Sequence, residues 1–189
     1  KNNQVSLKKT HSIAQGRTPK GNKGYEFLCR VAEIKQWIEE CLGEKIASTL
    51  ELSKDGLKNG VILAKVTKHF VPELVKRIIP ANSRGAIEYR HTENIVHFFY
   101  FLDYIDMPDL FRFELTDLYD GKNIPKVIFC LYALCFMLSQ QDDAPKLKSL
   151  VGKLAFEESD IKNSERRLKE ASVPDFGSFE PLMKSLELE

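Results

Sequence analysis

The most apolar part of the chain lies in its second half, over residues 124–138. Apolar side chains there occupy every face of a predicted helix, and no charged residue occurs from Val127 to Leu138. A helix without a polar face belongs in a protein core or in a membrane. Because a membrane span needs about 20 apolar residues and this run is much shorter, we expect a core helix that the rest of the chain surrounds. The preceding segment, Thr116 to Asn123, is polar and rich in turn-forming residues.

Amphipathic helices are predicted before this core helix. Apolar residues recur at spacings of three and four over residues 27–42, and Gly43 follows as the residue that ends the helix. A second helix is expected over residues 61–70, where Asn59 can accept hydrogen bonds from the free N–H groups at the helix start. Thr92 is the expected N-cap of a third helix. Since every strong signal has the helical period, the predicted fold class is all-α.

The segments between these helices are less regular. Residues 44–52 are weakly patterned and are interpreted as a strand-like or irregular segment. Residues 74–79 are expected to form a short turn, and residues 81–90 a loop. Residues 109–114 carry enough apolar side chains to pin a connector to the core through Leu110, Phe111 and Phe113.

The two ends of the chain differ from the middle in charge. Residues 1–24 contain six Lys or Arg and no acid, without apolar periodicity, and are interpreted as a basic arm. Residues 25–141 form the predicted domain. Residues 142–189 form a C-terminal extension that packs on the domain or follows it, with a charged helix over residues 157–171 and a short amphipathic helix after it.

Composition places limits on function. The chain has 189 residues, of which 43% are hydrophobic and 29% charged, and its formal net charge is +1. These values are typical of one soluble globular domain with extensions. The near-neutral charge argues against nucleic-acid binding, although a basic arm can attract an acidic partner. Because no signal peptide or membrane-spanning run is visible, we expect a cytoplasmic fragment that contacts no membrane. We also expect this fragment to be monomeric.

No residue pattern supports catalysis, a metal site or a cofactor. The four histidines have no second ligand at the i+3 or i+4 position, and the four cysteines contain no CxxC pair and are expected to be buried thiols. Gly121-Lys122 lacks the other residues of a phosphate loop, and Asp117 and Asp120 lack the spacing of a calcium loop. We therefore expect no enzyme activity, no metal and no cofactor.

Four segments in order resemble the single, calponin-type variety of the calponin homology domain. They are Lys35–Glu39, Leu57–Leu63, Glu93–Ile95 with Phe98, and Asp117–Asn123 before the core helix. The resemblance implies a compact bundle of four main helices with short connecting helices. The core helix departs from the common pattern because Tyr132 stands where tandem calponin homology modules usually have Trp.

A narrower resemblance links the chain to the N-terminal region of IQGAP proteins. The segments that carry it are Tyr25–Cys29, Cys41–Glu44, Arg90–Asn94, Thr116–Pro125 and Ala144–Lys153. Within the family the chain is similar to fungal members, above all to the fission-yeast member of the cytokinetic ring. The resemblance implies binding to filamentous actin, a role in cytokinesis and contractile ring assembly, and a parent protein with further calmodulin-binding and GAP-related regions.

The resemblance also indicates which residues face actin. In the family this surface uses the start of the last core helix, the loop before it and part of the first helix. The candidate residues in this chain are Thr116, Asp117, Leu118, Asp120, Lys122, Asn123, Ile124, Lys126, Arg30 and Lys35.

Each candidate also has an ordinary structural interpretation. Leu118 and Ile124 could be core residues, and Asp117 and Asn123 could be helix caps. Arg30 and Lys35 could be exposed, solvated charges on the first helix.

A second function remains open at this stage. The chain could be a regulatory adaptor that binds calmodulin or a signalling protein instead of actin. The charged helix over residues 157–171 and the basic helix over residues 61–70 motivate this alternative. A second basic group accompanies the latter helix and comprises Lys65, Lys68, Lys76 and Arg77.

Overall fold

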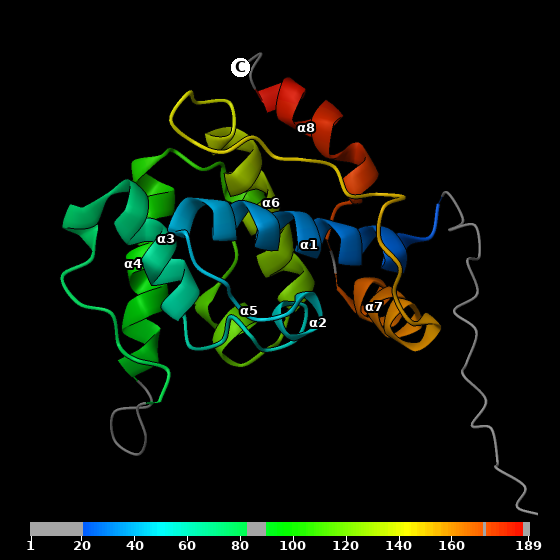
Figure 1. Cartoon of the computed structure of the whole chain (residues 1–189), viewed down its shortest axis with the longest axis horizontal. Helices are drawn as coiled ribbons and strands as arrows, with labels where there is room; N and C mark the ends of the chain where they lie inside the picture. Colours follow the sequence, from blue (N-terminus) through cyan, green and yellow to red (C-terminus); the bar gives the residue numbers. More distant parts are fainter. Residues whose placement is uncertain (1–20, 83–89, 172, 187–189) are drawn as a thin grey trace, which may run out of the picture.

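The computed structural model describes residues 21–82, 90–171 and 173–186. All regular elements within these residues are helical, so the prediction of an all-α fold is confirmed. Four longer helices form the body: α1 (Lys23–Leu42), α3 (Val61–Phe70), α4 (His91–Tyr104) and α6 (Ile124–Leu138) (Figure 1). Most of the predicted basic arm and most of the predicted loop at residues 81–90 lie outside the described residues.

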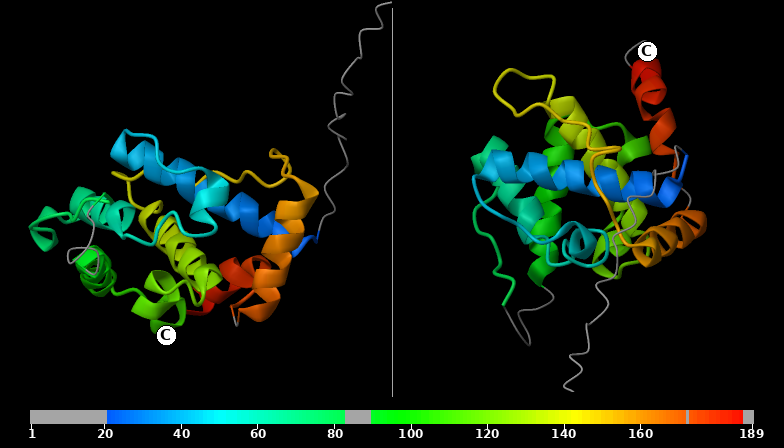
Figure 2. Two further views of the ribbon diagram at one scale, coloured as in Figure 1. Left: turned by 90° about the horizontal axis from the view of Figure 1, so that it is seen from below. Right: turned by 45° about the vertical axis from the view of Figure 1, so that its right-hand side comes forward.

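Shorter elements connect and extend this body. The connectors are α2 (Thr49–Leu52), η1 (Pro72–Leu74), η3 (Asp109–Phe111) and α5 (Leu115–Tyr119). The C-terminal extension contributes α7 (Glu158–Glu170), η4 (Phe176–Ser178) and α8 (Phe179–Leu186). Figure 2 shows α7 beside the start of α1, and α8 at the side of α6.

Helix α6 is the core helix that the apolar pattern predicts, with the same bounds. Its side chains are buried from Ile124 to Cys135, with the exception of Lys126. Asn123 caps the helix by accepting a hydrogen bond from the backbone N–H of Lys126 at 3.2 Å. Pro125 follows in the first turn, where its missing N–H leaves no helical bond unmade. The cap and the proline together explain why the helix begins at Ile124.

A buried asparagine joins the segments that precede and follow α3. Asn94 on α4 is fully buried. Its side-chain nitrogen donates to the carbonyl oxygens of Asn59 and Ile79, at 2.8 and 2.9 Å, and its oxygen accepts from the N–H of Ile79. Gly60 makes this approach possible because a Cβ there would lie 2.8 Å from the Cβ of Asn94. Two of the segments that carry the family resemblance, around Asn59 and Asn94, therefore meet at one hydrogen-bonded centre.

Two local predictions differ from the structure. Residues 44–48 are irregular, which is one of the two interpretations, but residues 49–52 form α2. A capping box starts this helix: Ser48 Oγ accepts from the N–H of Glu51, and the Glu51 carboxylate accepts from the N–H of Ser48. Helix α4 begins one residue before Thr92, at His91, whose ring nitrogen lies 2.9 Å from the Pro80 carbonyl oxygen. That tertiary contact holds His91 at the helix start.

The connectors also differ from expectation in two places. The short helical turn after α3 spans Pro72–Leu74 and ends where the predicted turn at residues 74–79 was to begin. In the connector at residues 109–114, Phe111 and Phe113 are buried as predicted, whereas Leu110 is 48% exposed. The 3-10 geometry of η3 directs only some of its side chains inward.

The extension begins with an extended segment along α1, here termed the strap (residues 144–156). The indole N–H of Trp37 donates to the Pro145 carbonyl oxygen at 2.7 Å. Further along the strap, the hydroxyl of Tyr25 donates to the Leu154 carbonyl oxygen at 2.8 Å. Because Trp37 lies near the end of α1 and Tyr25 near its start, the strap runs antiparallel to the helix.

Helix α7 then crosses the first turn of α1 at very close range. A Cβ on Gly24 would lie 3.0 Å from the backbone nitrogen of Glu165 and still closer to the carbonyl oxygen of Ile161. Arg167 donates to the carbonyl oxygen of Ser53 at 2.9 Å, which joins α7 to the loop after α2. The absence of a side chain at Gly24 is therefore what admits α7 to this position.

Helix α8, at the end of the extension, packs on the core through Phe179. Phe179 is 1% exposed, and its ring packs against those of Phe111, Phe129, Tyr132 and Phe136 at centroid distances of 4.9 to 5.7 Å. Edge-to-face aromatic contacts of this kind contribute beyond the area that they bury. The core around α6 thus continues into the extension.

Candidate functional site

The segment before α6 folds into a short helix and a closed turn. Helix α5 begins with the Asp117 carboxylate accepting from the N–H of Glu114 at 2.8 Å. The turn after it is closed by Gly121, which has φ +70° and donates to the Leu118 carbonyl oxygen. The N–H of Asn123 then donates to the carbonyl oxygen of Asp117 at 3.1 Å. The polar prelude is therefore a defined α5–turn–α6 corner.

Two lysines lie on the outer side of this corner, hereafter the α6 corner (residues 115–126). The Lys122 side chain is 62% exposed and its Nζ lies 3.7 Å from the Asp120 carboxylate. The Lys126 side chain is 33% exposed and its Nζ lies 3.4 Å from the Asp117 carboxylate. The Lys122 pair is exposed, and pairs of this kind contribute about 0–1 kcal/mol, so a partner can replace it at little cost. The Lys126 pair is less exposed, because the Asp117 side chain is 14% exposed.

The apolar candidates in the same corner do not lie on its surface. Leu118 is fully buried and Ile124 is only 8% exposed, so of the two interpretations of these candidates the structure agrees with core residues. Asp117 and Asn123 act as helix caps, although both remain partly accessible. The accessible residues of the α6 corner are Leu115, Thr116, Asp117, Tyr119, Asp120, Gly121, Lys122, Asn123 and Lys126.

Arg30 is not the exposed charge that its place on α1 suggested. Its side chain is 16% exposed, and its guanidinium donates to the Glu33 carboxylate and the Tyr132 hydroxyl, both at 2.9 Å. Burial alone would lower the pKa of Arg30, but the adjacent Glu33 carboxylate outweighs it and the pKa is raised. Burial also raises the pKa of Tyr132 to about 12. Arg30 therefore joins α1 to α6 inside the protein.

Glu33 on α1 is buried although it is an acid. Its side chain has no exposed area. One carboxylate oxygen pairs with Arg30, and the other accepts from the N–H of Leu150 in the strap at 2.8 Å. The strap covers this face of α1, which the helical period alone could not show.

Lys35 lies in a separate cluster on α1. Its Nζ is 2.6 Å from Glu39, which also pairs with Lys45 at 3.0 Å and accepts from the N–H of Ile46. Burial opposes ionisation of Glu39, but these donors outweigh it and lower the pKa to about 2. Lys35 therefore helps to close the end of α1, where it is paired with Glu39, and it does not belong to the α6 corner.

The second basic group of the sequence is spread over α3 and the segment after it. Lys65 pairs with Glu44 at 2.6 Å, and Arg77 lies 3.5 Å from Glu93. Lys68 and Lys76 are exposed. This group is partly neutralised by acids of the same chain.

Three further cations lie close to the α6 corner and had not been predicted. Lys58 lies over the ring of Tyr119, with its Nζ 5.9 Å from the ring centroid. Lys54 and Arg167 line a groove of about 460 Å³ together with Lys122. No sequence signal linked them, because they come from the loop after α2 and from α7, more than 40 residues from the corner on either side.

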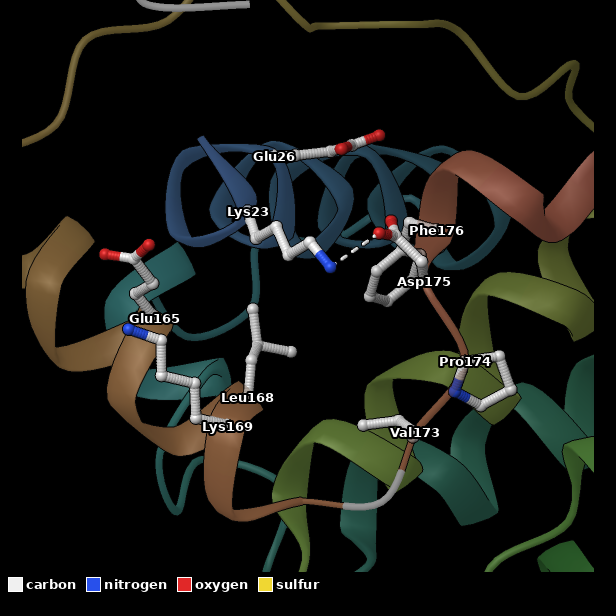
Figure 3. Close-up of a pocket in the computed structure, with 9 residues that line it drawn as sticks. All are labelled: Lys23, Glu26, Glu165, Leu168, Lys169, Val173, Pro174, Asp175 and Phe176. Atoms are coloured by element: carbon white, nitrogen blue, oxygen red, sulfur yellow. Dashed lines mark ion pairs between the residues drawn. The ribbon is translucent and has the colours of Figure 1, made fainter. Parts of the chain in front are cut away.

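A second, smaller cavity of about 170 Å³ lies on the other side of α7 (Figure 3). Lys23 and Asp175 bridge it through an ion pair of 3.0 Å, and Leu168, Val173 and Phe176 contribute apolar walls. The Asp175 carboxylate accepts from the N–H of Gly177, and this bond with the Lys23 pair lowers its pKa. This cavity marks where the extension closes on the start of α1.

The described residues contain no group of three or more His, Cys, Asp or Glu arranged to hold a metal ion. None of the described helices is both long and apolar enough to cross a membrane. All four cysteines are buried, and burial raises the pKa of Cys41 and Cys130 to about 12.

The amino-acid sequence of this chain is similar to those of known proteins. The family model of the calponin homology (CH) domain matches residues 28–139. The chain is 45% identical over 160 residues to the Ras GTPase-activating-like protein IQG1 of Candida albicans, which covers 84% of this chain and 10% of that protein. It is 42% identical over 156 residues to the Ras GTPase-activating-like protein rng2 of Schizosaccharomyces pombe, covering 82% of this chain and 10% of rng2.

A solved structure agrees with these relatives. The crystal structure of the calponin-homology domain of Rng2 from Schizosaccharomyces pombe is 42% identical, with a TM-score of 0.70, and the match covers 81% of this chain and 94% of that domain. This chain spans about a tenth of the length of the curated relatives that it matches first.

Proposed function

This chain belongs to the calponin homology domain family, in the form found in IQGAP proteins, and we propose from that premise that it binds filamentous actin. The parent protein would act as a cytoskeletal scaffold in cytokinesis and contractile ring assembly. Its location would accordingly be the cytoplasm, the actin cytoskeleton and the contractile ring. The GTPase-activating-like names of the relatives refer to proteins about ten times as long, and we propose no catalytic activity for this chain.

One observation supports the α6 corner as the actin-facing surface. The side chains of Lys122 and Lys126 lie on this surface. Their Nζ atoms are 3.7 and 3.4 Å from the carboxylates of Asp120 and Asp117. Helix α6 is buried from Val127 to Cys135, so a partner can reach the first half of this helix through the corner. An acidic filament surface is the complement of such exposed cations.

Co-sedimentation with filamentous actin tests this proposal. The chain should pellet with filaments at protein concentrations on the order of tens of micromolar in low salt, and less in high salt, because exposed charges are screened. Absence of pelleting under the low-salt condition would contradict the proposal.

Charge reversal at the corner should identify the surface. The double variant Lys122→Glu/Lys126→Glu should weaken binding about tenfold or more, since two attractive contacts become repulsive. Its melting temperature should fall only slightly, because the Lys122 pair is exposed and only the Lys126 pair involves a partly buried carboxylate, that of Asp117. The double variant Lys68→Glu/Lys76→Glu, with the same change in net charge on α3 and after η1, should bind as the parent chain does.

The alternative of a calmodulin-binding adaptor has less structural support. Calmodulin targets present a basic helix with a free apolar face. The apolar residues of α3, including Leu63, Ala64 and Val66, are buried in the body of the domain. Those of α7, Ile161 and Leu168, are partly buried where the helix packs on α1 and around the adjacent cavity. Titration of the chain with calcium-loaded calmodulin would show binding if this alternative held.

The proposed oligomeric state of the fragment is a monomer. Large hydrophobic side chains that are exposed in the described residues are few and comprise Tyr100, Tyr104, Leu110 and Val151. Light scattering during size-exclusion chromatography should therefore give one chain mass, and a dimer mass would contradict this.

A further inference from the structure

The groove beside the α6 corner is built from three separate parts of the chain. The loop after α2 contributes Lys54 and Asp55, the corner contributes Gly121, Lys122, Ile124 and Pro125, and α7 contributes Arg167, Glu170 and Ala171. Its volume is about 460 Å³. We call it the tripartite groove. It is open to solvent on the same side as the exposed Lys122 side chain, which lines it.

The charges in the groove are unequal. Lys54, Lys122 and Arg167 are cationic, whereas Asp55 and Glu170 are anionic. Lys54, Lys122 and the two acids are exposed and therefore available to a partner. Ile124 and Pro125 at the start of α6 also line the groove, but both are buried and supply little apolar area. A groove whose lining carries three cations and two anions has an excess of positive charge, which suits an acidic segment.

Helix α7 holds its wall of the groove by two independent contacts. Arg167 is tied by its hydrogen bond of 2.9 Å to the Ser53 carbonyl oxygen, which immediately precedes Lys54. At the other side of the helix, the close crossing at Gly24 seats α7 on α1. A guanidinium that is already fixed loses less side-chain entropy when it binds a carboxylate.

We propose that the tripartite groove receives an acidic segment of the actin filament, so that α7 of the C-terminal extension forms part of the actin-binding surface. The inference rests on the proposed function and extends it, because it assigns a role in binding to Lys54, Arg167 and Glu170. It also gives the extension a function beyond stability: α7 supplies one wall of the site.

Two single variants test the charge of the groove in the full chain. Lys54→Glu should weaken co-sedimentation with filamentous actin about fivefold or more. Glu170→Lys should strengthen it about twofold to fivefold, because it removes an acid that would repel the filament segment. A gain in affinity is informative, since a variant that only damaged the fold would not bind more tightly.

Matched controls lie on α7 away from the groove. Lys162→Glu makes the same change in net charge as Lys54→Glu, and Glu158→Lys makes the same change as Glu170→Lys. The two control side chains are 70% and 80% exposed. Neither residue lines the groove. Both control variants should bind as the parent chain does, so that any effect of overall charge is separated from an effect of the groove.

A third variant tests the position of α7. Gly24→Leu places a side chain in the crossing with α7 and should displace this helix without changing any residue of the groove. Binding should fall to the level of Lys54→Glu, while fluorescence of the single tryptophan, Trp37, reports whether the body of the domain remains folded.

The outcomes separate this inference from the proposed function. If the parent chain pellets with actin and Lys122→Glu/Lys126→Glu does not, the proposed function holds. If in that case Lys54→Glu and Glu170→Lys both bind as their controls do, the role of the groove is excluded while the α6 corner stands. If the parent chain itself fails to pellet, both proposals are overturned.

Discussion

At the scale of single residues, the buried pair of Arg30 and Glu33 connects three parts of the chain. The guanidinium bonds the Tyr132 hydroxyl on α6 and lies 5.0 Å from the centroid of its ring. The Glu33 carboxylate bonds Arg30 and the backbone of Leu150. Arg30, a predicted surface candidate, thus serves with Glu33 to hold α1, α6 and the strap together. Buried charges require such partners because their transfer from water is costly.

Removal of Glu33 should therefore destabilise the protein strongly. Glu33→Ala leaves the Arg30 guanidinium largely buried without its main counter-charge, and we expect a loss of about 3–5 kcal/mol in the free energy of unfolding. Urea denaturation measures it. Gln at the same position keeps an acceptor for the N–H of Leu150 and should lose less. Equal stability of Glu33→Ala and the parent chain would contradict the role of this pair.

Glu39 should make stability depend on pH in the acid range. Its pKa in the folded chain is lowered from 4.5 to about 2, so the unfolded chain binds the proton more readily. The carboxylate therefore stabilises the fold fully above pH 4.5, and this contribution is lost as the pH falls through 2. Between these pH values, Glu39→Gln should lose less stability on acidification than the parent chain. The control Glu73→Gln, at an exposed site on η1, should follow the parent curve.

At the scale of elements, local caps set the ends of the helices, whereas tertiary hydrogen bonds set the conformation of the strap. Helices α1, α3 and α6 begin and end near the residues that caps, prolines and glycines indicate: Asn22, Gly43, Asn59 and Asn123 all act at helix ends. The strap has no such signal. Its conformation depends on bonds to α1 from the indole of Trp37 and the hydroxyl of Tyr25.

Each end of the strap should loosen independently when its bond is removed. Trp37→Phe deletes the donor to the Pro145 carbonyl and should cost about 1–3 kcal/mol through the unpaired carbonyl and the lost ring volume. Tyr25→Phe removes the bonds to Leu154 and Gly152 at the other end. Hydrogen exchange should rise first in the half of the strap that each variant touches. Uniform exchange along the strap in both variants would contradict this.

At the scale of the whole molecule, we propose that the domain at residues 25–141 and the extension fold as one unit. Phe176, Phe179 and Met183 of the extension are buried against the core around α6. Arg167 is hydrogen-bonded to the loop after α2, and the strap is hydrogen-bonded to helix α1. A family match that ends at residue 139 therefore does not mark the end of the packed core.

Truncation tests whether the domain and the extension fold as one unit. A chain that ends at Gln141 exposes the apolar surface that the strap and α8 cover, and it should bind a hydrophobic dye and melt at a lower temperature. Loss of α8 alone, in a chain that ends at Ala171, should give an intermediate melting temperature. The point variant Phe179→Ala should cost about 3–5 kcal/mol in urea denaturation. A chain ending at Gln141 that is as stable as the parent would show that the domain is independent.

The amino-acid sequence by itself determined the all-α class, the bounds of α6 and the position of the α6 corner. These depend on the helical period and on local caps such as Asn123 and Pro125, which act within a few residues along the chain. The four cysteines, expected to be buried thiols, are buried.

Only the tertiary structure decided which of these residues remain on the surface and what stands beside them. Arg30, Glu33 and Leu118 lie inside because α6, the strap and the body of the domain cover them. Lys54 and Arg167 join Lys122 because α7 folds back across α1 at Gly24. The physical reason is that burial and charge clustering depend on contacts between segments far apart in the chain, whereas periodicity and capping depend on neighbours.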